Sequence, residues 1–215
     1  GMKAGLWIEP EVVGTLCKDM LEHYGEDCYL QRFGKRLAVS SRHFLDYRNE
    51  QVRKYMSETI RRMVEDYGAD YIKFDYNDDL TYDPTNHSFI EFFKGYHEFL
   101  HRINREHPEV YLENCASGGG RYDAGMLYYM PQTWTSDDSD AEERLMIQYG
   151  TSIVYPYSSM GAHVSACPNH QVDRTTPFKM RCNVAMPGQF GFELDLRPDP
   201  LCTFTSNRFL RKLIT

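Results

Sequence analysis

The sequence predicts an α/β protein whose strands form a parallel (β/α)-barrel. Strand-like apolar runs alternate with helical patterns along most of the chain, which favours a parallel sheet covered by helices. About six strands are expected, and several end in polar or charged residues, as barrel strands do where they carry chemistry. A doubly wound open sheet gives the same alternation, but the chain has no Gly-rich dinucleotide fingerprint to favour it.

The first expected elements are a strand at residues 3–8 and a helix at 50–67. The strand is an apolar run that ends before Pro10, because proline has no N–H to donate to a strand ladder. In the helix, apolar residues recur at helical spacing, and Gly68 follows at the position where helices commonly end. These apolar residues are Val52, Tyr55, Met56, Ile60, Met63, Val64 and Tyr67.

From residue 69 onward the alternation is regular. Apolar and aromatic residues predict a strand at 69–76, and an apolar stripe predicts a helix at 88–105, with Pro108 beyond its end. The remaining expected elements are a strand at 109–115, a short strand at 132–136, a helix at 140–152, a strand at 153–156, a helix at 176–186 and a strand at 189–196. We therefore expect one barrel domain over residues 1–196, followed by a loosely held tail at 197–215.

The composition argues against several classes of partner. The 215-residue chain has a net charge of −7 and a pI near 5.6, so nucleic acid and anionic membrane surfaces would be repelled. No apolar run approaches the roughly 20 residues that span a bilayer. The cysteines lack paired spacing, which predicts reduced thiols and a cytoplasmic protein. They are Cys17, Cys28, Cys115, Cys167, Cys182 and Cys202.

Lys73 and Asp75 place two opposite charges on one face of the strand expected at 69–76. Because side chains alternate along a strand, residues two apart point the same way and lie about 6–7 Å apart. The lysine would then help to keep the aspartate ionised, and an anionic carboxylate in a closed site is a good nucleophile or electrostatic anchor. The alternative is a buried Lys–Asp ion pair with a structural role.

A second acidic cluster lies at residues 133–144, between a strand and a helix. Helix capping and the helix dipole explain most of it. Asp137 is different, because it precedes the cap and follows the strand end at Trp134, where a carboxyl group beside an indole can keep its proton. One anionic and one protonated carboxyl group are the pair that glycosidic bond cleavage requires. The residues explained by capping are Asp138, Ser139, Asp140 and Glu142, with Ser139 and Glu142 as the capping box.

Long motifs follow one another in a familiar order along the chain. They are GLWIEPE at 5–11, YIKFDYN at 71–77, the segment beginning ENCASGGG at 113–152 and MPGQFGFELDL at 186–196. Together they resemble the catalytic barrel of the family 36 glycoside hydrolases, mainly α-galactosidases, over roughly residues 2–196. The resemblance implies a (β/α)8 TIM-type barrel that is incomplete in this chain, because the family's first strands are missing from it.

The resemblance also implies a retaining α-galactosidase that needs no metal ion or organic cofactor. It implies that Asp75, in the family's K-x-D strand, is the nucleophile and that Asp137, in W-T-S-D, is the general acid/base. The substrate would be a small-molecule α-galactoside, cleaved through a covalent galactosyl-enzyme intermediate. The implied substrate-binding residues are Lys73, Trp7, Arg42, Cys115, Ser117, Gly118, Asn77 and Trp134.

The chain also departs from the family pattern. Family members are several times longer, and a pair of adjacent aspartates on an upstream strand binds the 4- and 6-hydroxyls of galactose. No residue of this chain corresponds to that pair. A barrel that lacks strands leaves open sheet edges, which favour association with another chain. We expect the full-length protein to form a homo-oligomer.

Other interpretations are open at this point. Within the family, the protein could be an α-N-acetylgalactosaminidase or a galactosyl transferase, and a truncated barrel could be a non-catalytic sugar-binding domain. Cys115 and Arg121 enclose five residues, as in the loop of cysteine phosphatases. His163, Cys167 and His170 could suggest zinc, although their spacing fits no standard structural site and an ordinary loop explains them as well.

Overall fold

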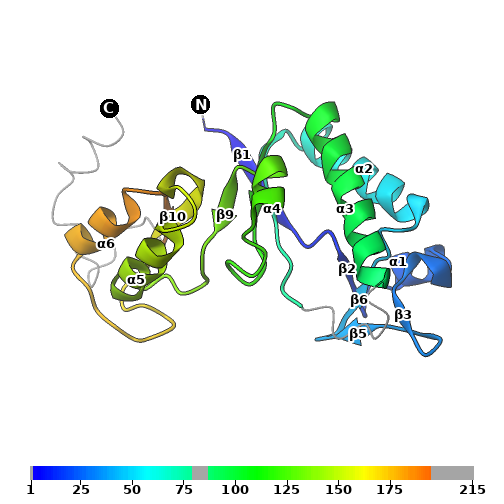
Figure 1. The fold of residues 1–215 in the computed structure, drawn as a ribbon, viewed down its shortest axis with the longest axis horizontal. Helices are drawn as coiled ribbons and strands as arrows, with labels where there is room; N and C mark the ends of the chain where they lie inside the picture. Colours follow the sequence, from blue (N-terminus) through cyan, green and yellow to red (C-terminus); the bar gives the residue numbers. More distant parts are fainter. Residues whose placement is uncertain (1, 79–86, 195–215) are drawn as a thin grey trace. The chain divides into compact units, whose positions relative to one another are not determined.

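The structure, a computed structural model, describes residues 2–78 and 87–194. The chain divides into two units, Gly1–Thr133 and Trp134–Thr215, and each is described separately (Figure 1). The tail expected at 197–215 lies outside the described residues. Among the described residues, we find no helix with the length and apolar character that crossing a membrane requires.

Parallel strands form the main sheet of the first unit. They are β1 (Ala4–Ile8), β7 (Ala69–Phe74), β8 (Tyr111–Asn114) and β9 (Gln132–Trp134), in the order β1-β7-β8-β9. The register places Trp7, Lys73, Glu113 and Gln132 in one row across these strands. Because the strands are parallel, their carboxyl ends lie at one edge of the sheet, which is the edge that carries the chemistry in a barrel.

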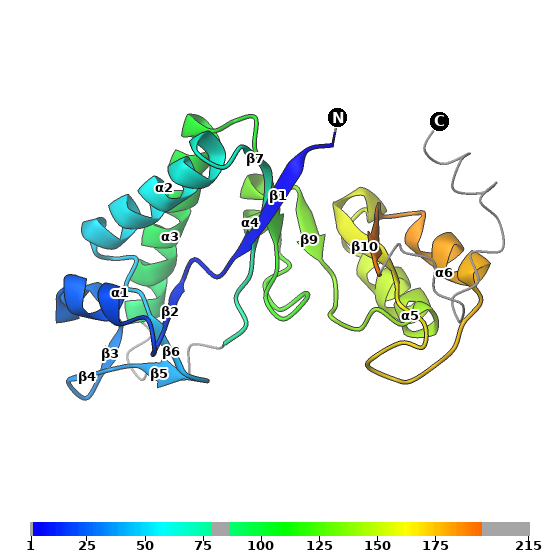
Figure 2. The same cartoon turned by 180° about the vertical axis from the view of Figure 1, so that it is seen from behind.

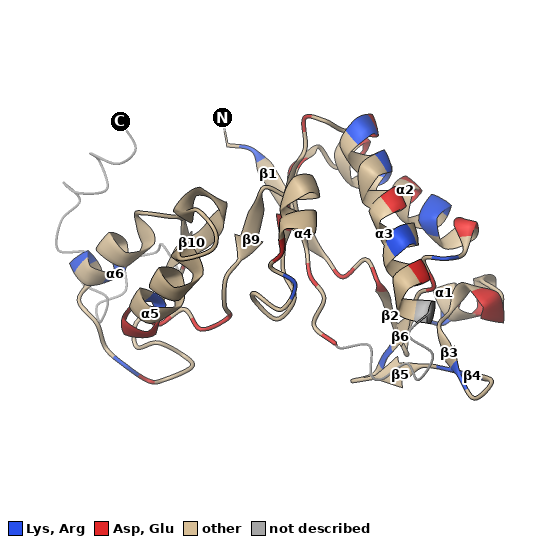
Figure 3. Ribbon diagram, viewed as in Figure 1, with Lys and Arg blue, Asp and Glu red and all other residues tan. Residues whose placement is uncertain are grey.

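The helices of the first unit follow the predicted pattern. They are α2 (Glu50–Glu65), α3 (His87–Glu106) and the shorter, unexpected α4 (Ala124–Tyr129). Helix α2 begins where the Asn49 side chain accepts the Gln51 N–H at 2.8 Å, and it ends before Gly68, whose φ of +69° suits glycine. Helices α2 and α3 lie side by side (Figure 2), and acidic and basic residues are interspersed along both (Figure 3).

The core of the first unit is rich in aromatic rings. Phe74 from β7 and Phe99 from α3 are both buried, and their rings are stacked with centroids 6.2 Å apart. Tyr47 packs edge-on against Phe92 and Tyr96, at centroid distances of 5.7 and 4.9 Å. Each buried ring of this size contributes roughly 1.5–3 kcal/mol. This packing fixes β7, and with it the residues that follow β7.

Residues 12–44 form small elements that the sequence pattern does not predict. They are β2 (Val12–Gly14), α1 (Lys18–His23), η1 (Glu26–Cys28), β3 (Gln31–Arg32), β4 (Lys35–Arg36), β5 (Ala38–Val39) and β6 (Arg42–Phe44). Strands β2, β6 and β5 form an antiparallel sheet, and β3 pairs with β4 across a turn in which Phe33 and Gly34 have positive φ. Strands of two or three residues are too short to show an alternation.

The second unit contains its own parallel strand pair. Its elements are α5 (Ala141–Ser152), η2 (Tyr157–Ser159), β10 (Met160–Ser165), α6 (Phe178–Ala185) and β11 (Gln189–Glu193). Strands β10 and β11 are paired in parallel, and Ala162, Val164, Cys182 and Ala185 form a small core between β10 and α6. Gly188 lies so close to β10 that a Cβ there would be 2.7 Å from the Met160 carbonyl oxygen.

The strand predicted at 153–156 is wrong. The N–H groups of Val154 and Tyr155 donate to the carbonyl of Thr151, which continues the turn at the end of α5. Ile153 and Val154 are more than two-thirds exposed, so the apolar run does not mark a buried strand. The strand that follows α5 is β10 instead. The position of Pro156 after the run also disfavours a strand, since its nitrogen cannot donate.

Candidate active site

Asp75 follows β7 directly and is buried, with 8% of its surface exposed. Its backbone N–H donates to the Ile8 carbonyl at 2.9 Å, which fixes the residue against the end of β1. The Trp7 indole N–H donates to one carboxylate oxygen at 3.1 Å, and the Tyr76 backbone N–H donates to the other at 2.8 Å. Both oxygens of Asp75 are therefore engaged by donors from fixed positions.

These donors determine the charge of Asp75. Burial by itself raises the pKa of this carboxyl group, but hydrogen bonds from the Cys115, Trp7 and Asn77 side chains and from the Tyr76 N–H outweigh burial and lower it. The carboxylate is therefore ionised at neutral pH. Hydrogen bonds from Trp7 on β1, from Cys115 after β8 and from the two residues that follow Asp75 account for the lowered pKa.

Lys73 has a different carboxylate partner. Its ammonium lies 3.2 Å from Oε1 of Glu113, the residue opposite it on β8. Glu113 is 1% exposed, and its second oxygen accepts a hydrogen bond from the Gln132 side-chain amide at 2.7 Å. Lys73 thus forms an ion pair between adjacent strands, with a partner that the pattern of its own strand does not predict.

Arg42 joins a polar network beside Asp75. Its guanidinium donates to Glu9 at 3.1 Å and to Asp78 at 3.0 Å. Glu9 also accepts the Asn77 side-chain amide at 3.0 Å, and the Ser117 hydroxyl donates to the Asn77 side-chain oxygen at 3.3 Å. Glu9 and Asp78 were not among the predicted site residues, although Glu9 is an acid directly after a strand, as Asp75 is.

The loop after β8 presents Cys115, Ser117 and Gly118. Burial raises the pKa of the Cys115 thiol to about 12, so the thiol stays protonated and can donate to Asp75. Ser117 and Gly118 have φ values of +45° and +85°, which turn the chain sharply here. A cavity of about 490 Å³ opens beside this loop, lined by residues that include Asn77, Ser117 and Phe92.

The geometry does not support a cysteine phosphatase. A protonated thiol is a poor nucleophile. The Arg121 side chain is 13% exposed and donates to Glu11, to the Asn114 side chain at 2.7 Å and to the Cys115 carbonyl at 3.3 Å. These bonds hold the loop in place and occupy the guanidinium donors that a phosphate would need.

In the second unit, Trp134 ends β9 and Asp137 lies in the loop that follows. Hydrogen bonds from Arg144 fix the backbone of this loop. The guanidinium of Arg144 lies 4.3 Å from the centre of the Trp134 ring and donates to the carbonyls of Ser136 at 2.5 Å and Asp138 at 2.6 Å. Burial lowers the pKa of Arg144 to about 10, so it remains a cation at neutral pH. Asp137 itself is exposed, on a loop whose backbone is fixed on both sides of it.

The helix cap after this loop differs from the predicted one. Asp140, not Ser139, caps α5, since its side chain accepts the N–H groups of Glu142 and Glu143. Ser139 instead receives the Asn169 side-chain amide at 3.3 Å. Either residue type serves as an N-cap, so the sequence alone could not separate them.

His163 and Cys167 have contacts other than a metal ion. The His163 ring lies 4.5 Å from the Trp134 ring, and the Cys167 thiol is 3.7 Å from the Thr176 carbonyl. His170 is exposed. Within residues 2–78 and 87–194, no three His, Cys, Asp or Glu side chains are grouped so that they could hold a metal ion.

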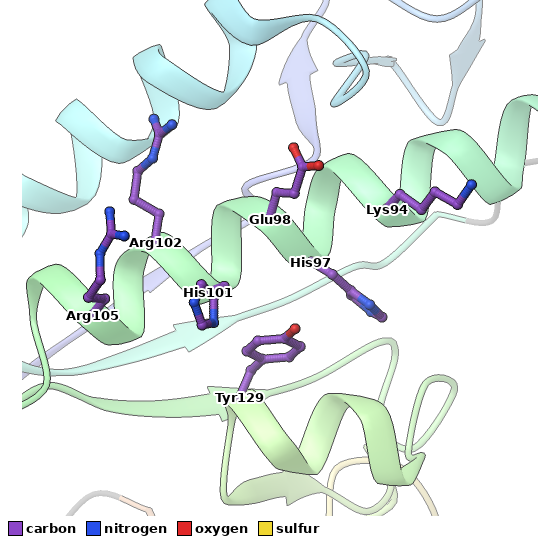
Figure 4. A pocket seen from close by; sticks show the side chains of 7 residues that line it. All are labelled: Lys94, His97, Glu98, His101, Arg102, Arg105 and Tyr129. Carbon is purple, nitrogen blue, oxygen red and sulfur yellow. The ribbon is translucent and has the colours of Figure 1, made fainter.

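A second cavity, of about 590 Å³, lies on the helical surface of the first unit (Figure 4). Its walls come from one side of α3 and from Tyr129 of α4, whose ring packs near His97. Its lining includes the basic side chains of Lys94, Arg102 and Arg105 together with the acidic Glu98. None of the predicted site residues lines this cavity, so it is separate from the strand ends.

The structure thus brings together most of the predicted residues of the first unit. Trp7, Asn77 and Cys115 each donate to the Asp75 carboxylate. Ser117 and Arg42 join this group through Asn77 and its acceptor Glu9. Lys73 lies in the same strand, paired with Glu113. Trp134 and Asp137 belong to the second unit.

The comparisons with known proteins identify the family. The family model described as Melibiase matches residues 1–201. The chain belongs to the melibiase family. Alpha-galactosidase AgaA from Geobacillus stearothermophilus is 42% identical over 204 residues, which are 91% of this chain and 28% of that protein. The bifunctional alpha-galactosidase/sucrose kinase AgaSK from Mediterraneibacter gnavus is 42% identical over 197 residues, 91% of this chain and 21% of that protein.

Solved structures of melibiases share the fold. The galactosidase domain of AgaSK has a TM-score of 0.84 at 42% identity and covers 93% of this chain and 28% of that one. The GH36 alpha-galactosidase AgaA from Geobacillus stearothermophilus has a TM-score of 0.83 at 41% identity, with 94% and 29% covered. These results confirm the predicted family and the predicted α/β fold, a TIM-type barrel that is incomplete here. The chain spans less than a third of the length of these relatives.

Proposed function

We propose that the full-length protein is a retaining α-galactosidase in which Asp75 attacks the anomeric carbon of an α-galactoside. The environment of Asp75 carries the proposal. Its carboxylate is buried at the end of a parallel strand, accepts hydrogen bonds from Trp7 and Tyr76, and has a lowered pKa. A carboxylate held anionic in this way is the nucleophile that a retaining glycosidase requires. The α-galactosidase relatives support the same reaction.

Asp137 is the proposed general acid/base. It protonates the leaving oxygen while Asp75 forms the galactosyl-enzyme, and it then takes a proton from the water that hydrolyses this intermediate. The configuration at the anomeric carbon is retained, since it inverts twice. In such enzymes the two carboxyl groups are about 5–5.5 Å apart, and both must face one glycosidic bond. The bonds from Arg144 to the Asp137 loop support this role, because a fixed loop holds a proton donor in place.

The proposed substrates are galacto-oligosaccharides. Variants of AgaA have been solved in complex with stachyose and with raffinose, and that relative is 40–41% identical to this chain. Trp7, Lys73, Asn77 and Ser117 would contact the sugar, together with Cys115, Gly118 and Trp134. Arg42 is also a proposed substrate-binding residue, and its ion pairs with Glu9 and Asp78 hold its guanidinium beside this site.

Substitution of the nucleophile tests this function in the full-length protein. Asp75→Asn should abolish turnover of a nitrophenyl α-galactoside, while Asp70→Asn, at the opposite end of the same strand, should keep the parental rate. Azide should restore activity to Asp75→Gly and yield a product of the opposite anomer, because the anion replaces the missing nucleophile. Parental activity in Asp75→Asn would refute the assignment. A parallel assay with the N-acetylgalactosaminide separates the two sugar specificities.

We also propose a cytoplasmic location and a homo-oligomeric state for the full-length protein. All five cysteines of the described part are free thiols, as a reducing compartment requires. Light scattering of the full-length protein gives its mass in solution and tests the second statement. Fractionation of the cells that produce it tests the first.

A further inference from the structure

A row of polar side chains crosses the sheet of the first unit just below Asp75. Lys73 on β7 is opposite Glu113 on β8, and Glu113 is opposite Gln132 on β9. The Lys73 ammonium lies 3.2 Å from one oxygen of Glu113, and the Gln132 amide nitrogen lies 2.7 Å from the other. Adjacent strands hold the three residues in one register, so the row is part of the sheet and not of a loop.

Glu113 has the burial of a core residue. The exposed fraction of its side chain is 1%, against 21% for the side chain of Lys73. A buried carboxylate is costly unless it is paired and hydrogen-bonded, and here each oxygen has a partner. The Glu113 carboxylate is thus held within the core by Gln132. The Lys73 ammonium, which is more exposed, pairs with the other oxygen of this fixed carboxylate.

A fixed anion changes what the lysine can do. A lysine side chain has a flexible four-carbon stem, and its compact ammonium takes many positions unless a partner selects one. Lys73 is two residues before Asp75 on the same strand, so both side chains point to the same face, about 6–7 Å apart along the strand. The Glu113 carboxylate thus selects an ammonium position on the face that carries the proposed nucleophile.

We propose that Glu113 is a positioning residue for sugar binding: it holds the Lys73 ammonium at a hydroxyl of the substrate, and Gln132 in turn holds Glu113. This inference rests on the proposed function, since it takes the face bearing Asp75 as the sugar site. Glu113 does not touch the sugar in this arrangement. Its effect on binding passes through Lys73.

The experiment measures galactose affinity and turnover in the full-length protein. Glu113→Gln keeps the shape and removes the charge. We expect it to weaken galactose binding and lower kcat/KM by about tenfold or more, the scale expected when a positioned group is displaced. Gln132→Met, which removes the amide donor to Glu113, should lower the same two quantities by a smaller factor. Glu109→Gln, an exposed residue just before β8, is the matched control and should leave both unchanged.

A double-mutant cycle separates positioning from a general structural effect. In a Lys73→Met background, Glu113→Gln should cause no further loss of galactose affinity or kcat/KM, because its effect passes through Lys73. An additive loss in the double variant would overturn the proposal, and so would parental galactose affinity in Glu113→Gln. Calorimetric titration with galactose measures the affinities even in variants without turnover.

The two proposals fail in distinguishable ways. Loss of turnover in Asp75→Asn with parental values in both Glu113→Gln and Gln132→Met would leave the glycosidase function standing and remove the positioning role. Parental turnover in Asp75→Asn would remove the proposed function, while the galactose titrations would still decide whether Glu113 acts through Lys73. Circular dichroism of each variant confirms that the fold is intact before the affinities are compared.

Discussion

At the scale of the residue, the charge of Asp75 depends on donors that come from three separate parts of the chain. Trp7 lies on β1, Cys115 follows β8, and Tyr76 is the next residue in sequence. Each donor stabilises the ionised form of a carboxyl group whose burial alone would favour the neutral form. The ionisation of Asp75, on which its proposed role depends, is therefore determined by these hydrogen-bond donors.

Removal of the indole donor should shift the pH dependence. Trp7→Phe deletes the hydrogen bond to Asp75, so the lowered pKa of that carboxyl group should rise. Because the nucleophile must be ionised, the acid limb of kcat/KM should move to higher pH. The pH profile of kcat/KM checks this. Leu6→Ala, on the opposite face of β1, should leave the acid limb in place, and an unmoved limb in Trp7→Phe would contradict the account.

The same lowered pKa has a consequence for stability. A carboxyl group whose native pKa lies below its unfolded value stabilises the fold fully above the unfolded pKa, and this contribution is lost as the pH falls through the native pKa. The stabilisation from Asp75 should therefore disappear on acidification and not at alkaline pH. Urea unfolding of the parent and Asp75→Asn at neutral and acidic pH measures the difference, which should be largest at neutral pH.

The proposed proton donor has its own signature. Asp137→Asn should lower kcat/KM by about 10²- to 10⁴-fold for raffinose, whose leaving group needs a proton, and far less for a nitrophenyl galactoside, whose leaving group does not. Initial rates on the two substrates give the ratio. Asp138→Asn, the neighbouring residue with a backbone-capping role, should affect both substrates alike. An equal loss on both substrates in Asp137→Asn would rule out the acid/base role.

The sequence predicts these residues unequally well. Asp75 and Asp137 are recognisable because each is an acid at a strand end within a long family motif. The sequence does not predict Glu113 and Glu9 as members of the site. Their roles depend on the order and register of the strands in the sheet, which the pattern of a single strand does not show. For the same reason, the sequence pattern associates Lys73 with Asp75, which lies on the same face of the same strand. In the structure, the Lys73 ammonium pairs with Glu113 on the adjacent strand.

At the scale of the element, the loop between β9 and α5 is held by a single buried cation. Arg144 donates to the carbonyls of Ser136, Asp138 and Gly161 and to the Thr135 hydroxyl. These bonds satisfy backbone groups that would otherwise leave the loop free to move. The element therefore presents Asp137 on a rigid support, although Asp137 itself is exposed.

Removal of this support should cost both stability and turnover. Arg144→Met keeps the length of the side chain but leaves buried carbonyls without donors, and we expect a loss of about 2–4 kcal/mol in the free energy of unfolding. Urea unfolding measures the loss, and kcat on raffinose should fall with it. Arg62→Met, on the exposed face of α2, should change neither quantity appreciably. A parental unfolding free energy in Arg144→Met would contradict this role.

Two glycines of the second unit provide a matched pair. A Cβ at Gly188 would meet the Met160 carbonyl oxygen at 2.7 Å, whereas a Cβ at Gly150, within α5, would meet no atom within 4 Å. Gly188→Ala should therefore destabilise the protein by about 1–3 kcal/mol. Gly150→Ala should stabilise it by about 0.5–1 kcal/mol, because alanine favours the helix. Urea unfolding of both variants checks the opposite signs, and equal signs would contradict the packing described here.

Long periodic elements are the ones that the sequence predicts best. Helices α2 and α3 and strand β7 combine many apolar residues with clear end signals such as Gly68 and Pro108. The strand expected at 153–156 fails because an apolar run can also be the exposed end of a helix. The small strands between residues 12 and 44 are held by antiparallel pairing over two or three residues, a length at which no pattern can be recognised.

At the scale of the whole molecule, the chain belongs to the melibiase family, and Asp75 lies in its first unit and Asp137 in its second. The order of the family motifs predicts the family and the barrel fold, and the matched residues 1–201 confirm both. The relatives are more than three times as long as the aligned part. We therefore propose catalysis for the full-length protein and not for these 215 residues alone.

The central claim is that Asp75 forms a covalent bond to galactose. Incubation of the full-length protein with a fluorinated α-galactoside whose glycosyl-enzyme hydrolyses slowly, followed by proteolysis and mass spectrometry, tests it directly. We predict one added fluorogalactosyl group on the peptide that contains YIKFDYN, with fragmentation placing it on Asp75. An active enzyme that carries the group on another residue, or that turns over the reagent without any adduct on this peptide, would contradict the account.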